Sequence, residues 1–191
     1  MASEREKMLS GELYLAADTE LVALRRAARR LTHTFNATRE DEPEARVAIL
    51  RELLGACGPN IEIEPPFRCD YGANISVGDG FYMNFDGVIL DCAAVEIGAH
   101  VLCGPGVHIY AATHPLLANE RMTGLESARP VRIGDRVWLG GRVIVCPGVT
   151  IGADTTIAAG SVVTRDIPAG VLAGGNPCRV IRRLDELSPA G

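Results

Sequence analysis

One histidine stands where a regular chain is interrupted. His114 lies in "ATHP", near the start of a stretch from Ile109 to Gly134 that breaks a six-residue repeat. A neutral imidazole suits general-base chemistry, because its ordinary pKa of about 6.5 is close to working pH. The following Pro115 restrains the backbone of His114 toward an extended conformation, which helps to fix the ring. His114 is therefore the candidate catalytic base.

The other histidines and the cysteines do not suggest a metal site. His33 lies in a helical stretch, His100 in an expected turn and His108 at an outward-facing strand position. From His100 to His108 to His114 the steps are eight and six residues, which is irregular for a ligand cluster. The six cysteines include no C-x-x-C pair, so we interpret them as small buried residues in a reducing compartment. We expect no catalytic metal and no covalent intermediate on cysteine.

A carboxylate beside a catalytic histidine orients the ring and stabilises its protonated form. Glu126 and Asp91 are both candidates for this role. The sequence does not decide between them, and a carbonyl oxygen is a third option.

The element that must position His114 is built from hexads. One series of inward aliphatic positions is spaced by six and comprises Ile133, Leu139, Val145, Ile151, Ile157 and Val163. The same spacing holds upstream at Ile97, Cys103 and Ile109, and Ile109 to Ile133 is 24 residues, or four hexads. A two-residue slip near Ala93 and Ala94 separates an earlier set. The repeat therefore resumes in phase after the interruption.

Such hexads are typical of a parallel β-helix, in which each unit gives a short strand and a turn. Inward side chains stack on their equivalents in neighbouring coils, and Gly supplies the backbone angles of tight corners. A β-sandwich with short strands would not keep six-residue spacing through so many steps. We predict a mainly β fold over 59–191, with residues 110–130 extruded as a loop.

Residues 1–58 read as a separate helical segment. Leu21, Leu24, Ala28 and Leu31 form a 3–4 stripe after a possible N-cap at Asp18. A second helix is predicted after Asp41, with Pro43 in its first turn. We expect a small helical hairpin that packs on the β-helix.

Length, charge and the distribution of apolar residues argue against a nucleic-acid-binding or membrane protein. The chain has 191 residues and a net charge of −5, which gives no support to nucleic-acid binding. The charged N-terminus does not resemble a signal peptide, and no apolar run reaches the ~18 residues of a membrane helix. We expect a cytoplasmic protein without a membrane or nucleic-acid partner.

Several segments together resemble a known family. They are "SGELYLAAD", "NFDGVILD", "HIYAATHP", "PVRIGDRVWLGGRVIVCPGVTIG" and "IAAGSVVTRDIPAGVLAGGNPCRVIR". In this order they are similar to the hexapeptide-repeat sugar O-acetyltransferases of the maltose, galactoside and nodulation-factor type, most of all the maltose branch. The resemblance implies a left-handed β-helix, acetyl-coenzyme A as co-substrate and a homotrimer. It also implies active sites between subunits, with the loop reaching a neighbour.

The resemblance also implies positions for the acceptor sugar. His114 matches the catalytic histidine of the family. The acceptor-binding positions would be Asn84, Asp91, Asp70, Tyr82 and Arg25. Asp91 and Cys92 straddle the position of an acidic sugar ligand, and Asp91 is the one we choose. An acidic residue that some relatives carry in the first segment is Ala16 here, although Asp18 is close by.

The coenzyme positions follow by the same resemblance. They would be Gly141, Ala159, Thr164, Arg165, Arg179 and Arg182. Trp138 would either form a wall of the pantetheine tunnel or fill space beside the coil. The arginines suit the nucleotide phosphates, because guanidinium groups pair with them through forked hydrogen bonds. Gly141 would offer a backbone N–H near the thioester and allow close approach.

These observations predict an acetyl-coenzyme A-dependent O-acetyltransferase that transfers acetyl directly to a sugar hydroxyl, with His114 as general base. One alternative is a hexapeptide-repeat acetyltransferase for another acceptor, such as an amino-sugar, serine or a xenobiotic. The other is a non-catalytic trimeric β-helix scaffold. The N-terminal "GELY" favours the sugar branch.

Overall fold

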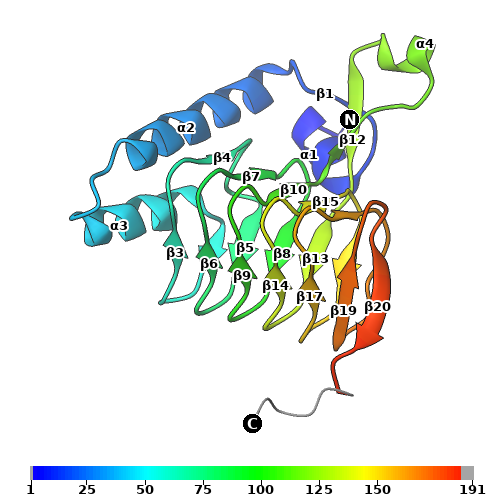
Figure 1. Ribbon diagram of the computed structural model, residues 1–191. Helices are drawn as coiled ribbons and strands as arrows, with labels where there is room; N and C mark the ends of the chain where they lie inside the picture. Colours follow the sequence, from blue (N-terminus) through cyan, green and yellow to red (C-terminus); the bar gives the residue numbers. More distant parts are fainter. Residues whose placement is uncertain (1, 186–191) are drawn as a thin grey trace.

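The hexads fold into a stack of coils with three faces (Figure 1), in a computed structural model that describes residues 2–185. Face one contains β2 (Ala56–Cys57), β5 (Ile75–Val77), β8 (Val95–Ile97), β13 (Val131–Ile133) and β16 (Thr150–Ile151). Face two contains β3 (Glu62–Ile63), β6 (Tyr82–Met83), β9 (Leu102–Cys103), β14 (Trp138–Leu139), β17 (Thr156–Ile157), β19 (Val171–Gly174) and β20 (Arg179–Arg183). Face three contains β4 (Phe67–Cys69), β7 (Gly87–Leu90), β10 (His108–Tyr110), β15 (Ile144–Val145) and β18 (Val162–Val163). The prediction of a mainly β, parallel β-helix is confirmed.

The pairing register shows where the repeat gains residues. Ile75 pairs with Val95, a step of 95 − 75 = 20, which is two more than three hexads and matches the slip at Ala93 and Ala94. Val95 pairs with Val131, a step of 131 − 95 = 36 that includes the extruded loop. Later coils step by 18, as from Arg132 to Thr150. The loop therefore adds 18 residues and leaves the stack in phase, as the spacing predicts.

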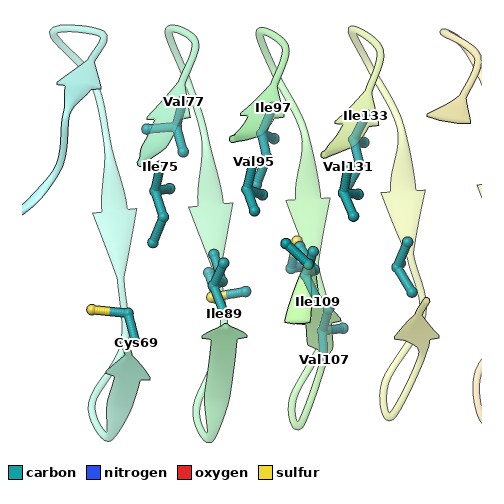
Figure 2. Close-up of a cluster of buried hydrophobic side chains, with 14 of the residues drawn as sticks. Cys69, Ile75, Val77, Ile89, Val95, Ile97, Val107, Ile109, Val131 and Ile133 are labelled. Carbon is teal, nitrogen blue, oxygen red and sulfur yellow. The ribbon is translucent and has the colours of Figure 1, made fainter. Parts of the chain in front are cut away.

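The core is a set of rows that run along the stack axis (Figure 2). Val77, Ile97 and Ile133 form one such row, and Val95 lies between Ile75 and Val131 in the next. All of these side chains are at most 5% exposed. Burying a branched aliphatic side chain stabilises a fold by about 1.5–3 kcal/mol, so each coil is held by its neighbours.

Close approach between coils requires glycine at the corners. At Gly140 an added Cβ would lie 2.6 Å from the backbone nitrogen of Ala159 in the next coil. No side chain can relieve a clash with backbone, so the glycine that follows the inward residue allows the coils to stack.

The N-terminal segment contains α1 (Glu4–Ser10), α2 (Thr19–Asn36) and α3 (Pro43–Leu53). Asp18 caps α2 as predicted, because its carboxylate accepts the backbone N–H groups of Glu20 and Leu21. Leu24, placed on the buried stripe by its spacing, is 37% exposed. Asp41, whose place just before the second predicted helix suits an N-cap, does not cap it. The N-cap of α3 is Glu42, and the Asp41 carboxylate instead pairs with the Arg39 guanidinium at 2.7 Å.

A small antiparallel sheet joins this segment to the extruded loop. It contains β1 (Tyr14–Leu15), β12 (Leu125–Ala128) and β11 (Ala112–Thr113), in that order across the sheet. The loop also carries a short helix, α4 (Ala118–Arg121), which projects from the body of the molecule (Figure 1). The base of the loop is thus tied to a strand about a hundred residues earlier. Within residues 2–185, none of the helices has the length and apolar character needed to cross a membrane.

Candidate active site

His114 is held at the end of a short β-ladder. In the antiparallel pair β11–β12, Ala112 faces Ala128 and Thr113 faces Ser127. Continued for one residue beyond the end of β11, this register would bring His114 level with Glu126. Glu126 in turn pairs with Tyr14 of β1, and the Tyr14 hydroxyl donates to Glu126 Oε2 at 3.2 Å. Three strands therefore fix the backbone around the imidazole.

The imidazole opens onto a cleft of about 430 Å³ at the base of the loop. The cleft is lined by Leu13, Thr113, His114, Pro115, Leu116, Glu120, Ser127, Arg129 and Pro147. His114 itself is exposed, so a ligand can reach its ring. The loop beyond it presents apolar side chains to solvent, with Leu116 at 94% and Met122 at 87% exposure. Such exposure marks a surface suited to contact with another molecule.

Asp91 does not lie where a sugar could reach it. Its side chain is fully buried, and Oδ1 accepts the backbone N–H groups of Asp70 at 3.0 Å and Tyr71 at 2.8 Å. Oδ2 accepts the N–H of Asn74 at 3.3 Å. Burial raises the pKa of this carboxyl to about 6, against the lowering effect of these N–H donors. The expected acceptor contact is therefore replaced by a structural one, in which Asp91 fixes the corner that carries Asp70.

Asp70 and Arg25 have different partners near that corner. The Arg25 guanidinium donates to the Tyr71 hydroxyl at 2.7 Å and to the Ala16 carbonyl at 2.6 Å. Cys92 Sγ lies 3.5 Å from Asp70 Oδ2, and burial raises the pKa of this thiol to about 12. The thiol therefore stays protonated and is no nucleophile.

A second group of candidates lies on face two. Cross-strand pairing forms a single row of outward side chains, namely Tyr82, Leu102, Trp138, Thr156, Leu172 and Arg182. Trp138 is 54% exposed and Leu102 48%. With strands about 4.8 Å apart, the five steps from Tyr82 to Arg182 span roughly 24 Å. The row is an extended, partly apolar track that ends in a cation.

The remaining candidates stand at two corners of the coils. Asn84, Gly141 and Ala159 follow β6, β14 and β17, where face two turns into face three. Thr164 and Arg165 follow β18, where face three turns into face one, and both are exposed. The extruded loop leaves the stack at this same type of corner. Arg179, at the start of β20, donates to the carbonyl of Cys178 at 2.8 Å.

The candidates thus form two groups within one chain. Asp70, Arg25 and Glu126 lie around the corner from which the His114 loop emerges, and Thr164 and Arg165 lie at the same type of corner, whereas the Tyr82–Arg182 row lies on the opposite face. The two groups do not meet in a single copy of the chain.

Sequence reasoning missed several residues of the His114 group. Tyr14 and Tyr71 hold Glu126 and Arg25, and Arg129 lines the cleft. Tyr14 lies in the "GELY" segment, which served only as a family signal. Its partner Glu126 is 112 residues away, and no local pattern links the two.

Comparison with known proteins shows which family has this sequence and architecture. Residues 7–58 match the maltose acetyltransferase hexapeptide capping motif, and residues 130–165 match the bacterial transferase hexapeptide (six repeats). Nodulation protein L of Rhizobium meliloti (strain 1021) is 51% identical over 178 residues, covering 93% of this chain and 97% of that protein.

Two solved structures are similar over almost the whole chain. A maltose O-acetyltransferase from Clostridium difficile 630 aligns with a TM-score of 0.96 and 51% identity, covering 97% of this chain and 99% of that one. A galactoside acetyltransferase in complex with coenzyme A aligns with a TM-score of 0.93 and 38% identity, covering 96% and 92%. The β-helix is therefore the left-handed type. The chain belongs to the hexapeptide-repeat acetyltransferase family that includes the maltose and galactoside O-acetyltransferases.

Proposed function

We propose that the protein transfers the acetyl group of acetyl-coenzyme A to a hydroxyl of a sugar. The observation that carries the proposal is the exposed His114 ring at the cleft, directly after β11, whose partner strand β12 pairs in turn with β1. Relatives that act on maltose or galactosides support the acceptor class, and one solved relative holds coenzyme A.

In the proposed reaction His114 takes the proton of the acceptor hydroxyl as its oxygen attacks the thioester carbon. The tetrahedral intermediate collapses with cleavage of the carbon–sulfur bond, and the proton passes from the imidazolium to the departing thiolate. The products are the sugar ester and coenzyme A. Glu126 keeps the ring oriented and stabilises its charged form, acting through His114 rather than on the substrate. A backbone N–H at Gly141 would stabilise the oxyanion.

The acceptor would be held by Asp70, Arg25, Asn84 and Tyr82, with Asp91 positioning Asp70 through its backbone. The coenzyme would lie along the face-two row. Trp138 and Leu102 offer apolar surface to the pantetheine arm, and Arg182 with Arg179 offers cations to the phosphates. Ala159, Thr164 and Arg165 complete the set of proposed coenzyme contacts.

A complete site would require more than one copy of the chain. His114 projects from the corner opposite face two, so the row that binds coenzyme would come from a neighbouring subunit. A homotrimer with three shared sites satisfies this requirement, and the exposed Leu116 and Met122 would then cover the bound substrates.

An acceptor screen tests the proposal. The purified protein is given acetyl-coenzyme A with maltose, glucose, galactosides, glucosamine oligomers or serine, and thiol release is followed. Release that depends on a neutral sugar is the expected result. Release with serine alone would move the protein to another acceptor class, and no release with any acceptor would favour the non-catalytic scaffold.

A further inference from the structure

A groove runs between α2 and the outer side of face three, beside the acceptor corner. Helix α2 crosses above β4 and β7 in Figure 1. The groove has a volume of about 650 Å³. Its helical wall includes Arg29 and His33, and its strand wall includes Arg68 and Asp70. Nothing in the proposed reaction uses the groove beyond Asp70.

Hydrogen bonds hold α2 and β4, the two walls of the groove, in a fixed relative position. The Asn36 amide, at the end of α2, donates to the Phe67 carbonyl at 2.9 Å and accepts the Phe67 N–H at 2.8 Å. Helix and strand are thereby fixed to each other at one end. At the other end Asp91 fixes the backbone of Asp70. Arg29 and Arg68 consequently project from two elements whose separation is set.

The two guanidinium groups of this groove are not paired with a carboxylate in the described residues, although Asp70 also lines the groove. Arg29 and Arg68 are exposed, and neither guanidinium group has a hydrogen bond or ion pair with any residue in 2–185. Arg29 and His33 also line an adjoining hollow of about 490 Å³ with Arg26 and Arg30, and no acidic residue of the described part of the chain lines that hollow. The chain as a whole carries a net charge of −5, so this concentration of arginine opposes the overall charge.

The groove shares one residue, Asp70, with the proposed acceptor position. Asp70 lines the groove and is also the proposed acceptor contact. Leu90, on the groove floor, pairs with Tyr110, from which the chain continues to His114. An acceptor that binds Asp70 through one of its hydroxyls would therefore have a neighbouring substituent in the groove, near Arg68 and Arg29.

We propose that this groove, defined by Arg29, His33, Arg68 and Asp70, is a subsite for an anionic substituent of the acceptor. The inference rests on the proposed function and narrows its substrate class to saccharides that carry a carboxylate or phosphate away from the acetylated hydroxyl. Planar guanidinium groups on two facing elements suit such an anion, because each offers forked donors to its oxygens. Asp70 would accept from a sugar hydroxyl next to it.

Matched acceptor pairs test the subsite. Maltobionate and maltitol share a glucosyl unit and differ by a carboxylate, while glucose 1-phosphate and methyl glucoside differ by a phosphate. We expect kcat/KM to be about tenfold higher or more for at least one anionic member, the gain of one good charge-assisted contact. The preference should shrink in 0.5 M NaCl, because salt screens exposed charges. The pair that shows it identifies the anion.

The double substitution Arg29→Ala/Arg68→Ala is expected to bring the ratio within each pair to about 1. Arg51→Ala, an exposed arginine on α3, is the matched control and should keep the wild-type ratio. A wild-type ratio near 1 in both pairs would overturn the subsite, while turnover of maltitol would still support sugar acetylation.

If no acceptor releases thiol, the proposed function fails and binding decides on the groove. Calorimetric titration with maltobionate and maltitol, and with glucose 1-phosphate and methyl glucoside, then replaces turnover. Tighter binding of an anionic member that is lost in the double variant supports the subsite, and equal binding within both pairs contradicts it.

Discussion

At the scale of single residues, the two carboxylates near the proposed base have different roles. Asp91 is buried and accepts three backbone N–H groups, whereas Glu126 is half-buried and lies on β12, the strand that pairs with β11 just before His114. Both are candidates from the sequence because each is an acidic residue. Burial, backbone hydrogen bonds and strand pairing, which the sequence does not show, distinguish them.

Glu126 is expected to support the charged form of His114 during the reaction. Glu126→Gln should lower kcat about tenfold and leave the KM for both substrates nearly unchanged, because a neutral amide no longer stabilises the imidazolium. Steady-state rates with each substrate varied in turn measure these constants. Glu126→Asp should restore part of kcat. Equal losses in both variants, together with a lower thermal midpoint, would indicate a structural role only.

Asp91 is expected to leave a signature in stability. Its pKa in the folded chain, about 6, lies above the ordinary 3.8, so between these values the folded chain binds more protons than the unfolded chain. The free energy of unfolding should therefore fall by roughly 2–3 kcal/mol as pH rises from about 4 to 6. Above pH 6 the contribution of Asp91 should no longer change with pH. Urea unfolding between pH 4 and 6 should show this decrease in the free energy of unfolding in the wild type. The control Asp79→Asn, in which Asp91 is intact, should show it too. Its persistence in Asp91→Asn would contradict the assignment.

At the scale of elements, the sequence predicts the repeat better than it predicts contacts between distant segments. Inward positions such as Ile97 and Ile133 can be predicted from the six-residue repeat alone. The loop can be predicted as well, because the repeat resumes in phase after it. The Tyr14–Glu126 contact depends on pairing between β1 and β12, which no local pattern encodes. The burial of Asp91 could not be predicted either, because an acidic residue in a binding site and one in a buried corner look the same in the sequence.

Strand β20 is expected to serve the coenzyme rather than the sugar. Arg179→Ala/Arg182→Ala should raise the KM for acetyl-coenzyme A by about tenfold or more and change the KM for the sugar much less, because phosphates lose charge-assisted partners. Initial rates with each substrate varied in turn measure both constants. Arg132→Ala, whose partner Glu96 lies on face one, is the control. Equal increases in the two KM values would count against the phosphate contact.

At the scale of the whole molecule, one chain separates the proposed base from the proposed coenzyme track. A shared site makes a prediction about mixtures. His114→Ala and Arg179→Glu/Arg182→Glu each damage one half of every site, so each alone should be nearly inactive at low acetyl-coenzyme A. After co-refolding in equal amounts, about a quarter of the sites should combine two intact halves. Recovery of about a quarter of wild-type activity is expected. No recovery, with mixed oligomers verified by mass, would place both halves in one chain.

The central claim is that His114 is the general base of an acetyl transfer. The most direct measurement is the kcat of His114→Ala, with acetyl-coenzyme A and a sugar that the screen identifies, beside the Kd for acetyl-coenzyme A of the same variant. We expect kcat to fall by about 10²–10⁴-fold, the usual contribution of a general base, while the Kd changes little. A kcat close to that of the wild type would contradict the account.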